Sequence, residues 1–277
     1  MSLMSKLLMS TVLATVTLSA TPSKETLLNY VRKVVVKNPE VKIKDIKIVE
    51  EKTIESLKGW QVLLTTMEIE YQKKKMSIPE TMFIRDGVIT GNLIDLKTGK
   101  DYRKNIKPKV PSRLYNEEHR LFGNKDAKHK ILIFSDPQCP FCQDIVPAIF
   151  KASKENPTKI AIYYYHLPLL RIHPVSGILT RIMHVAQQEG KSDVVEKMYT
   201  LKINPKETDI TKILSAVKSH TGYSISASKI EAKEVKEAIH ADEKDAGVMM
   251  VAGTPTIYID GKWDKQRDGY KKLISIF

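Results

Sequence analysis

Hydrophobic positions in the first part of the chain follow two different periods. From Lys24 to Lys37 they recur every three or four residues, which predicts an amphipathic helix that Asn38-Pro39 ends. After this proline they recur at every second position, with one position skipped, which is typical of half-buried strands. The predicted strands cover 41–48 and 60–71, a hairpin around Asp-Gly covers 82–91, and a further strand with a turn covers 93–100. Residues 21–107 are therefore expected to form one helix and a small antiparallel sheet.

A connector rich in proline follows this first unit. Lys107-Pro108-Lys109-Val110-Pro111 is expected to be stiff, because proline fixes φ and removes a hydrogen-bond donor. Ser112 is suited to cap a short helix over 113–122, and Gly123-Asn124 is suited to end it. We therefore interpret residues 108–125 as a linker that contains a short helix.

Strands and helices alternate in the second half of the chain. The run Ile131-Leu132-Ile133-Phe134 is apolar throughout, as in a strand that is buried on both faces. A helix is predicted from the following turn to about Lys154. The remaining predicted elements are a strand over 160–165, a helical region over 176–249 with breaks at 204–205 and 221–222, a strand over 256–259 and a terminal helix over 269–277. The pattern as a whole predicts an α+β protein.

Composition excludes several classes of protein. The 277 residues are 42% hydrophobic and 28% charged, as in ordinary globular proteins. No run of 18 apolar residues occurs, which excludes a membrane protein with several spans. The 45 Lys and Arg against 32 Asp and Glu give a net charge of +13. These basic residues are scattered and no nucleic-acid-binding motif accompanies them, so we expect no nucleic-acid partner.

The N-terminus, Met1 to Ala20, has a short basic start, an apolar stretch and small residues at its end. This arrangement predicts a secretory signal peptide over residues 1–20, and the alternative is a buried first helix. A signal peptide implies that the protein works outside the cytoplasm, where disulfides form.

The two cysteines, Cys139 and Cys142, lie three positions apart where a buried strand turns into a helix. A cysteine at a helix N-terminus sits among unpaired N–H groups, which favour thiolate over thiol. We therefore expect Cys139 to be the nucleophile and Cys142, one turn into the helix, to be the resolving thiol. Pro140 suits the first turn of that helix. The alternatives are two structural cysteines and half of a metal site, although a complete metal site is not visible and we expect none.

A second motif, Gly253-Thr254-Pro255-Thr256, opens a predicted strand. Proline has no N–H and fits the first residue of a strand. A cis Thr254–Pro255 bond would present the Thr254 backbone to the disulfide and to an extended substrate, whereas an ordinary strand-initiating proline is the alternative.

These two motifs together resemble the Dsb proteins, which are periplasmic proteins with a thioredoxin fold. Phe134 to Cys142, with Asp136 three residues before the first cysteine, resembles DsbC and DsbG most. The stretch Met82–Asp101 also resembles their N-terminal dimerisation domain. Phe141 and Gln138 depart from the family pattern, and residues between the cysteines tune the redox potential.

The resemblance implies a V-shaped homodimer in the periplasm. It implies a signal peptide (1–20), a cystatin-like domain of helix and antiparallel sheet (21–107), a linker with a helix (108–125) and a thioredoxin-fold domain (126–277) with a helical insertion at about 174–250. Cys139 and Cys142 would be catalytic, and Pro140, Phe141, Thr254 and Pro255 would form the loops that bind substrate.

The activity that follows is thiol:disulfide interchange, as a disulfide isomerase or reductase, with no cofactor other than the dithiol itself. The implied partners are unfolded or misoxidised periplasmic proteins that contain cysteine, and a membrane redox partner of the DsbD or DsbB type. A disulfide-donating oxidase of the DsbA kind on a dimeric scaffold is the alternative within this class. A periplasmic chaperone that holds unfolded chains, or a metal-handling protein, is the alternative outside it.

Three polar residues near the motifs have weaker claims. His166 and His173 follow the second buried strand, where a histidine is more often structural than functional. Asp136 is suited either to shape the turn before Cys139 or to help in proton transfer.

Overall fold

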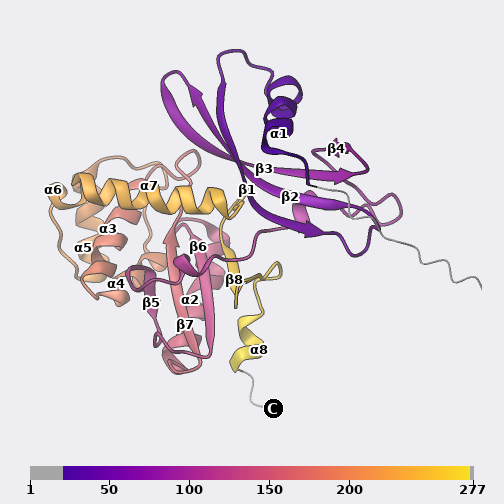
Figure 1. Ribbon diagram of the computed structural model, residues 1–277. Helices are drawn as coiled ribbons and strands as arrows, with labels where there is room; N and C mark the ends of the chain where they lie inside the picture. The colour runs from indigo at the N-terminus through magenta and orange to yellow at the C-terminus, as the bar shows by residue number, and fades with distance from the viewer. Residues whose placement is uncertain (1–20, 275–277) are drawn as a thin grey trace, which may run out of the picture.

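Two separate β-sheets organise the chain (Figure 1). The computed structural model describes residues 21–274. The predicted signal peptide and the last three residues of the predicted terminal helix lie outside the described residues. A four-stranded sheet forms the N-terminal unit and a five-stranded sheet forms the centre of the C-terminal unit.

The N-terminal unit is one helix on an antiparallel sheet. Helix α1 (Lys24–Tyr30) begins after Ser23, whose hydroxyl accepts the N–H of Thr26, and it continues as a π-turn over Val31–Val35. The strands, hydrogen-bonded in chain order, are β1 (Lys42–Thr53), β2 (Gln61–Tyr71), β3 (Lys74–Arg85) and β4 (Val88–Thr90). Its likeness to the cystatin fold stays a prediction.

Both later hairpins of this sheet turn through residues with positive φ. Asp86 and Gly87 have φ of 48° and 77°, as expected of the Asp-Gly turn. Gln72 and Lys73 reach φ of 49° and 62° without a glycine. Because no turn motif marks this second site, the start of β3 at residue 74 could not be recognised from the sequence.

The predicted strand over 93–100 is wrong. The structure has only an isolated bridge between Ile94 and Asp101 there. The reason is local, because the Asp95 carboxylate accepts the N–H groups of Lys97 and Thr98 and closes a turn at once.

The N-terminal sheet buries both of its faces. Helix α1 covers the first face with Leu27, and the π-turn after it does so with Val31. The second face is covered by residues from later in the chain, among them Tyr102, from the loop after β4, and Met250, from the C-terminal unit. Strand β3 also contacts helix α7 (Lys233–Val248) of that unit. The two units are therefore in direct contact through this second face.

The linker contains no α-helix, which corrects the prediction of one over 113–122. Two single 3₁₀ turns, Ser112–Leu114 and Glu117–His119, lead into strand β5 (Arg120–Phe122). Leu114 and Leu121 belong to different hydrophobic cores, whereas residues seven positions apart lie on the same side of a helix. An extended path is needed to reach both cores. The C-terminal unit thus begins before residue 126, the predicted boundary.

The C-terminal sheet is mixed, in the order β5-β7-β6-β8-β9. Its further strands are β6 (His129–Ser135), β7 (Ile160–His166), β8 (Thr256–Ile259) and β9 (Lys262–Trp263). Strands β6 and β7 are parallel, and the other neighbours are antiparallel. Because β6 is the central strand, the turn that follows its C-terminal end and carries both cysteines lies over the middle of the sheet at that end of the strands.

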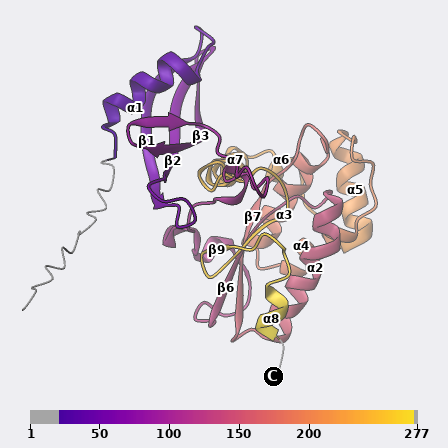
Figure 2. The same cartoon turned by 90° about the vertical axis from the view of Figure 1, so that its right-hand side faces the viewer.

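Successive residues of β6 face two different cores. Ile131 and Ile133 belong to one cluster, and Leu132 and Phe134 to the other. Helices therefore cover both faces, and α7 packs on the second with Ala246. Helix α7 lies between the N-terminal sheet and the C-terminal unit (Figure 2). The remaining helices are α2 (Pro140–Glu155), α3 (Ser176–Gln188), α4 (Ser192–Lys197), α5 (Ile210–Thr221), α6 (Ala227–Ile230) and α8 (Tyr270–Ile274). This two-sided burial explains the uninterrupted apolar run in the sequence.

Candidate active site

Cys139 is the N-cap residue of α2, directly after the turn that leaves β6. Its backbone is extended (φ −71°, ψ 121°), and Pro140 opens the helix, where a missing N–H costs nothing. The first N–H groups of this 16-residue helix point toward the cap. Cys139 is 5% exposed and Cys142 is fully buried. Both sulfurs are free thiols in the structure, so it represents the reduced dithiol.

The two thiols have opposite acidities. The pKa of Cys139 is lowered to about 5, first because the Cys142 thiol donates a hydrogen bond to it, and further because backbone N–H groups of α2 do so. Burial, followed by the hydrogen bond and the charge of Cys139, raises the pKa of Cys142. At neutral pH one sulfur is a thiolate and the other holds its proton, which is the division of roles expected of a nucleophile and a resolving thiol.

We expect the reactivity of the reduced protein to show this lowered pKa. The rate of Cys139 alkylation by iodoacetamide should rise with pH around a midpoint near 5 and then stay level, because only the thiolate reacts. An ordinary cysteine would keep gaining rate up to about pH 8.5. Cys142→Ala removes the hydrogen-bond donor and should move the midpoint upward. A wild-type midpoint above 7 would contradict the assignment.

A chain of buried hydroxyl groups lies behind Cys142. Tyr164 and Tyr199 share a hydrogen bond of 2.7 Å between their phenol oxygens, and Tyr199 donates to the Ser135 hydroxyl at 2.7 Å. The hydroxyl of Ser135 in turn hydrogen-bonds Cys142, which lowers the pKa of this thiol against the effect of burial. These three residues offer the resolving sulfur polar contact inside an otherwise apolar core. No sequence motif marks them, because they come from β6, β7 and the turn after α4.

The loop before β8 faces the nucleophile. The Thr254–Pro255 peptide bond is cis. The Cys139 sulfur lies 3.4 Å from the carbonyl oxygen of Thr254, to which it can donate a hydrogen bond only while it is protonated. Both predicted loop residues, Thr254 and Pro255, are thus beside the dithiol although they lie more than a hundred positions away in the chain. Phe141, between the cysteines, is 63% exposed and free to meet a substrate.

Asp136 holds the turn before Cys139 in place. Its carboxylate is fully buried and accepts four hydrogen bonds. The donors are the N–H groups of Gln138 (2.7 Å) and Leu169 (2.8 Å), the Ser176 hydroxyl (2.7 Å) and Nδ1 of His173 (3.2 Å). Asp136 therefore ties the dithiol turn to the segment after β7 and to α3. This geometry favours the turn-shaping role over proton transfer, and it assigns His173 to the same cluster.

His166 lies in the core, with its ring edge-on to Tyr164 at 4.9 Å and to His184 at 5.9 Å. Its backbone N–H donates to the carboxylate of Asp242, which also contacts His119. Burial, and then the nearby His184 and His119, lower the pKa of His166 well below its usual value. His166 is thus neutral in the folded protein and structural in character.

Protonation of His166 is expected to make the fold sensitive to acid. Below about pH 6.5 the unfolded chain binds a proton at His166, whereas the folded protein does not. The free energy of unfolding therefore falls as the pH falls. Replacing the ring by one that does not titrate, His166→Phe, should reduce the loss of stability between pH 7.5 and 5.5 by at most about 1.4 kcal/mol, the limit set by the ordinary pKa of the unfolded chain. Urea unfolding of both proteins at the two pH values measures this. An equal loss of stability in the wild-type protein and the variant would show that the pKa of His166 is not lowered by folding.

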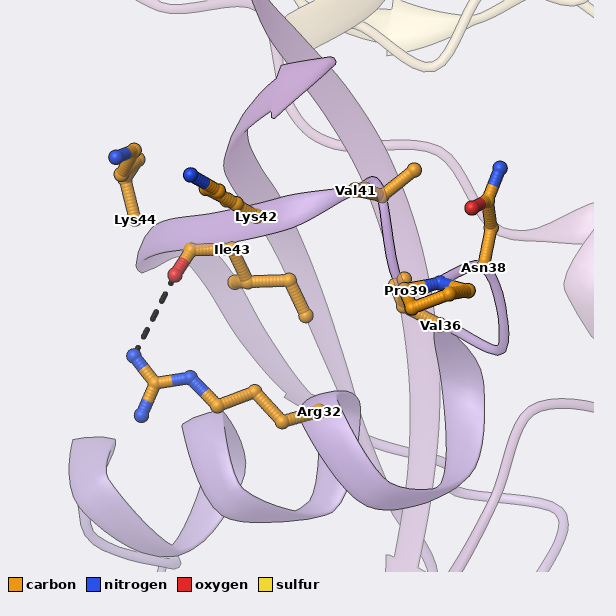
Figure 3. A pocket seen from close by; sticks show the side chains of 8 residues that line it. All are labelled: Arg32, Val36, Asn38, Pro39, Val41, Lys42, Ile43 and Lys44. Carbon is orange, nitrogen blue, oxygen red and sulfur yellow. Dashed lines mark hydrogen bonds between the residues drawn. The ribbon is translucent and has the colours of Figure 1, made fainter.

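A hollow in the N-terminal unit, away from the dithiol, lacks reactive groups. It has a volume of about 360 Å³, and Arg32 in its lining donates to the carbonyl oxygen of Ile43 at 3.4 Å (Figure 3). Its lining is basic and apolar, without a cysteine, histidine or carboxylate. Within residues 21–274, no three His, Cys, Asp or Glu side chains are placed to hold a metal ion. The dithiol therefore remains the candidate for chemistry.

Comparison with known protein families identifies the C-terminal unit. Residues 115–276, more than half of the chain, match the family model described as Thioredoxin. The match begins at residue 115, in the segment interpreted as linker, in agreement with the inclusion of β5 in the C-terminal sheet.

Curated relatives match about half of this chain. A protein named Na(+)/H(+) antiporter NhaA 1 from Mycolicibacterium gilvum (strain PYR-GCK) is 23% identical over 154 residues, which are 53% of this chain and 25% of that protein. A protein of the same name from Mycobacterium sp. (strain KMS) is 25% identical over 150 residues, 54% of this chain and 24% of that one. The chain thus spans about a quarter of the length of these relatives, and their name describes much longer proteins.

Two solved structures match part of this chain. Oxidised BdbD from Bacillus subtilis has a TM-score of 0.48 and 17% identity, covering 61% of this chain and 93% of its own. A periplasmic thioredoxin-like protein from Salmonella enterica serovar Typhimurium has a TM-score of 0.48 and 20% identity, covering 59% and 92%. Likenesses of this size carry no conclusion about activity. In the part of the chain that the structure describes, no helix has the length and apolar character needed to cross a membrane.

Proposed function

The chain belongs to the thioredoxin family, and we propose that it is a thiol:disulfide oxidoreductase that works through Cys139 and Cys142. The observation that carries this proposal is the opposite acidity of the two thiols. The pKa of Cys139 is lowered to about 5, while burial raises that of Cys142. Two structural cysteines in one core would have no reason to differ in this way.

The reaction follows from this asymmetry. The Cys139 thiolate attacks one sulfur of a substrate disulfide, a new S–S bond forms, and the other substrate sulfur leaves as a thiolate. Cys142 then gives up its proton and attacks the Cys139 sulfur, which releases the substrate as a dithiol and leaves a Cys139–Cys142 disulfide. Two electrons pass from the protein to the substrate. No cofactor beyond the dithiol is needed for this exchange.

The same steps support isomerisation. If another thiolate of the substrate displaces Cys139 before Cys142 does, the substrate leaves with a rearranged disulfide and the protein remains reduced. This direction, with the DsbC and DsbG type of protein as its model, is the function that we propose from the sequence resemblance.

One observation favours disulfide donation as a second candidate. The interactions that stabilise the Cys139 thiolate also stabilise the dithiol relative to the disulfide, which makes the oxidised form a better oxidant. The absence of the predicted linker helix from residues 113–122 also departs from the scaffold that the isomerase resemblance implies.

We also propose the setting of the reaction. The predicted signal peptide supports a place outside the cytoplasm, and the resemblance to the Dsb proteins supports the periplasm. There we propose unfolded or misoxidised proteins with cysteines as substrates and a membrane protein of the DsbD or DsbB type as the partner that restores the redox state. We propose a homodimer assembled through the N-terminal unit. Sedimentation velocity of the full chain, and of residues 108–277 alone if that part folds, distinguishes a dimer held by that unit from a monomer.

Two assays with ribonuclease and one redox equilibrium with glutathione test the proposed function. If the protein is an isomerase, its reduced form should restore the enzymatic activity of ribonuclease whose disulfides are scrambled. If it donates disulfides, its oxidised form should reoxidise reduced ribonuclease. The equilibrium of the dithiol with glutathione gives the reduction potential that decides between the two directions. Failure to form any reversible Cys139–Cys142 disulfide would remove the whole proposal.

A further inference from the structure

A groove of about 760 Å³ lies between the active site and the N-terminal unit. Its lining includes Phe141 and Thr254 of the active site, Thr81 of β3, and Lys107, directly before the linker. A substrate chain that extends away from a sulfur bound to Cys139 can therefore enter a space that both units build. We call this space the basic groove.

The charges that line the basic groove do not balance. Four cationic side chains, Arg103, Lys104, Lys107 and Arg267, face it together with one carboxylate, Asp101. Two of the cations are paired, since Lys104 lies 3.4 Å from Asp101 and Arg103 lies 2.7 Å from a carboxylate oxygen of Glu80. Within residues 21–274, Lys107 and Arg267 form no ion pair with a carboxylate.

Lys107 is an unusual cation because its ammonium group is half-buried without a counter-ion. It donates to the carbonyl oxygen of Met250 and lies 5.6 Å from the centre of the Trp263 ring. Burial lowers its pKa. A charge removed from water without an opposite charge beside it is unfavourable, and an anion that enters the groove would offset this cost.

Arg267 stands at the active-site end of the groove. Its guanidinium lies 6.0 Å from the centre of the Phe141 ring, which is 63% exposed between the two cysteines. The aromatic ring holds the cation beside the place where a substrate sulfur must lie, without neutralising it. The groove thus has one free cation next to the dithiol and another farther along its wall.

We propose that the basic groove binds an acidic side chain, Asp or Glu, that flanks the cysteine of a substrate polypeptide, with Lys107 and Arg267 as its ion-pair partners. This inference rests on the proposed function and names the substrates that the same site prefers. The N-terminal unit, through Thr81 and the loop before Lys107, is then part of the substrate site.

Peptide disulfides of different charge test the inference. Each probe is a short peptide with one cysteine joined to 2-nitro-5-thiobenzoate, with Asp-Asp, Asn-Asn or Lys-Lys beside the cysteine. The Cys139 thiolate of the reduced full chain attacks the peptide sulfur, forms the mixed disulfide and expels the coloured thiolate, whose absorbance gives the rate. We expect the Asp-Asp peptide to react at least about tenfold faster than the Lys-Lys peptide at low salt, and this ratio to shrink in 0.5 M salt.

Variants assign the preference to the two cations. Arg267→Gln with Lys107→Gln should bring the ratio of Asp-Asp to Lys-Lys rates below about twofold. The matched control, Lys212→Gln with Lys233→Gln, removes the same charge from exposed residues outside the groove and should keep the ratio. Arg267 lies on the partly exposed loop after β9. The single variant Arg267→Glu should react faster with the Lys-Lys peptide than with the Asp-Asp peptide, and it replaces the double variant if the latter folds poorly.

The outcomes separate this inference from the function on which it rests. Hydroxyethyl disulfide is uncharged and small, and its reduction reports the dithiol alone. If it is reduced at a normal rate while the peptides show no charge preference, or while the control loses the preference as much as the groove variant does, the groove inference is wrong and the function stands. If it is not reduced by the wild-type protein either, the proposed function fails first.

Discussion

Cys139→Ser is expected to abolish disulfide exchange, with a loss of more than about a thousandfold that leaves only the uncatalysed rate, because a serine hydroxyl is not ionised at neutral pH. The wild-type sulfur is a thiolate since its pKa is lowered to about 5. The buried Cys142, whose pKa is raised, is unable to replace it as the attacking group. Reduction of insulin or of a small disulfide measures the loss.

Cys142→Ser is expected to have a different effect from Cys139→Ser. Serine keeps a hydroxyl donor next to Cys139, so the first attack should proceed within about tenfold of the normal rate. Resolution of the intermediate is impossible, so a one-to-one mixed disulfide with the substrate should accumulate and be visible on a non-reducing gel. If Cys142→Ser formed no adduct while Cys139→Ser did, the roles of the two cysteines would be reversed.

The second large effect is expected at Asp136. Asp136→Ala should lower the free energy of unfolding by about 3–5 kcal/mol, because four donors in the core lose their common acceptor. Urea unfolding at pH 7 measures this. The turn before Cys139 should also loosen, since the N–H of Gln138 is one of the four donors, and the pH midpoint of Cys139 alkylation should rise.

Two further variants keep the Asp136 prediction testable. In the wild-type protein each carboxylate oxygen of Asp136 accepts from two donors. Asp136→Asn retains the shape of the side chain and one acceptor oxygen, so this variant should fold but be less stable than wild type. Asp193→Ala removes an exposed carboxylate that pairs with Lys197 on the surface and should change stability by less than about 0.5 kcal/mol. An equally small change in Asp136→Ala would show that the buried carboxylate is not an anchor.

Local features of the sequence could be read correctly where a short pattern has one structural solution. The all-apolar residues 131–134 required a strand with two buried faces, and α2 begins directly after Cys139 where the motif predicted a helix. The Asp86-Gly87 turn has the positive φ values that such a pair favours. Each of these predictions depends on residues within about ten positions of one another, where periodicity and turn chemistry act.

The linker and the partners of the dithiol could not be predicted in this way. Ser112 and Gly123-Asn124 suited the two ends of a helix over 113–122, but Leu114 and Leu121 pack on opposite faces of a sheet whose other strands lie far along the chain. The Ser135, Tyr199 and Tyr164 hydroxyls meet behind Cys142 only after β6, β7 and the segment after α4 have packed. Competition for burial and long-range hydrogen bonding overrode local preference at these positions.

The sequence by itself determined that a strand, a Cys-Pro-Phe-Cys turn and a helix follow one another, because hydrophobic periodicity and the stereochemistry of proline act over neighbouring residues. Only the tertiary structure decided which groups surround that turn. Asp136 acquired its four donors, Cys139 its contact with Thr254, and Lys107 and Arg267 their common groove through contacts between residues up to about 160 positions apart. The contacts of Asp136 and Cys139 depend on how the strands and helices of the C-terminal unit pack, and the groove depends on how the two units pack. No local pattern of the sequence encodes either kind of packing.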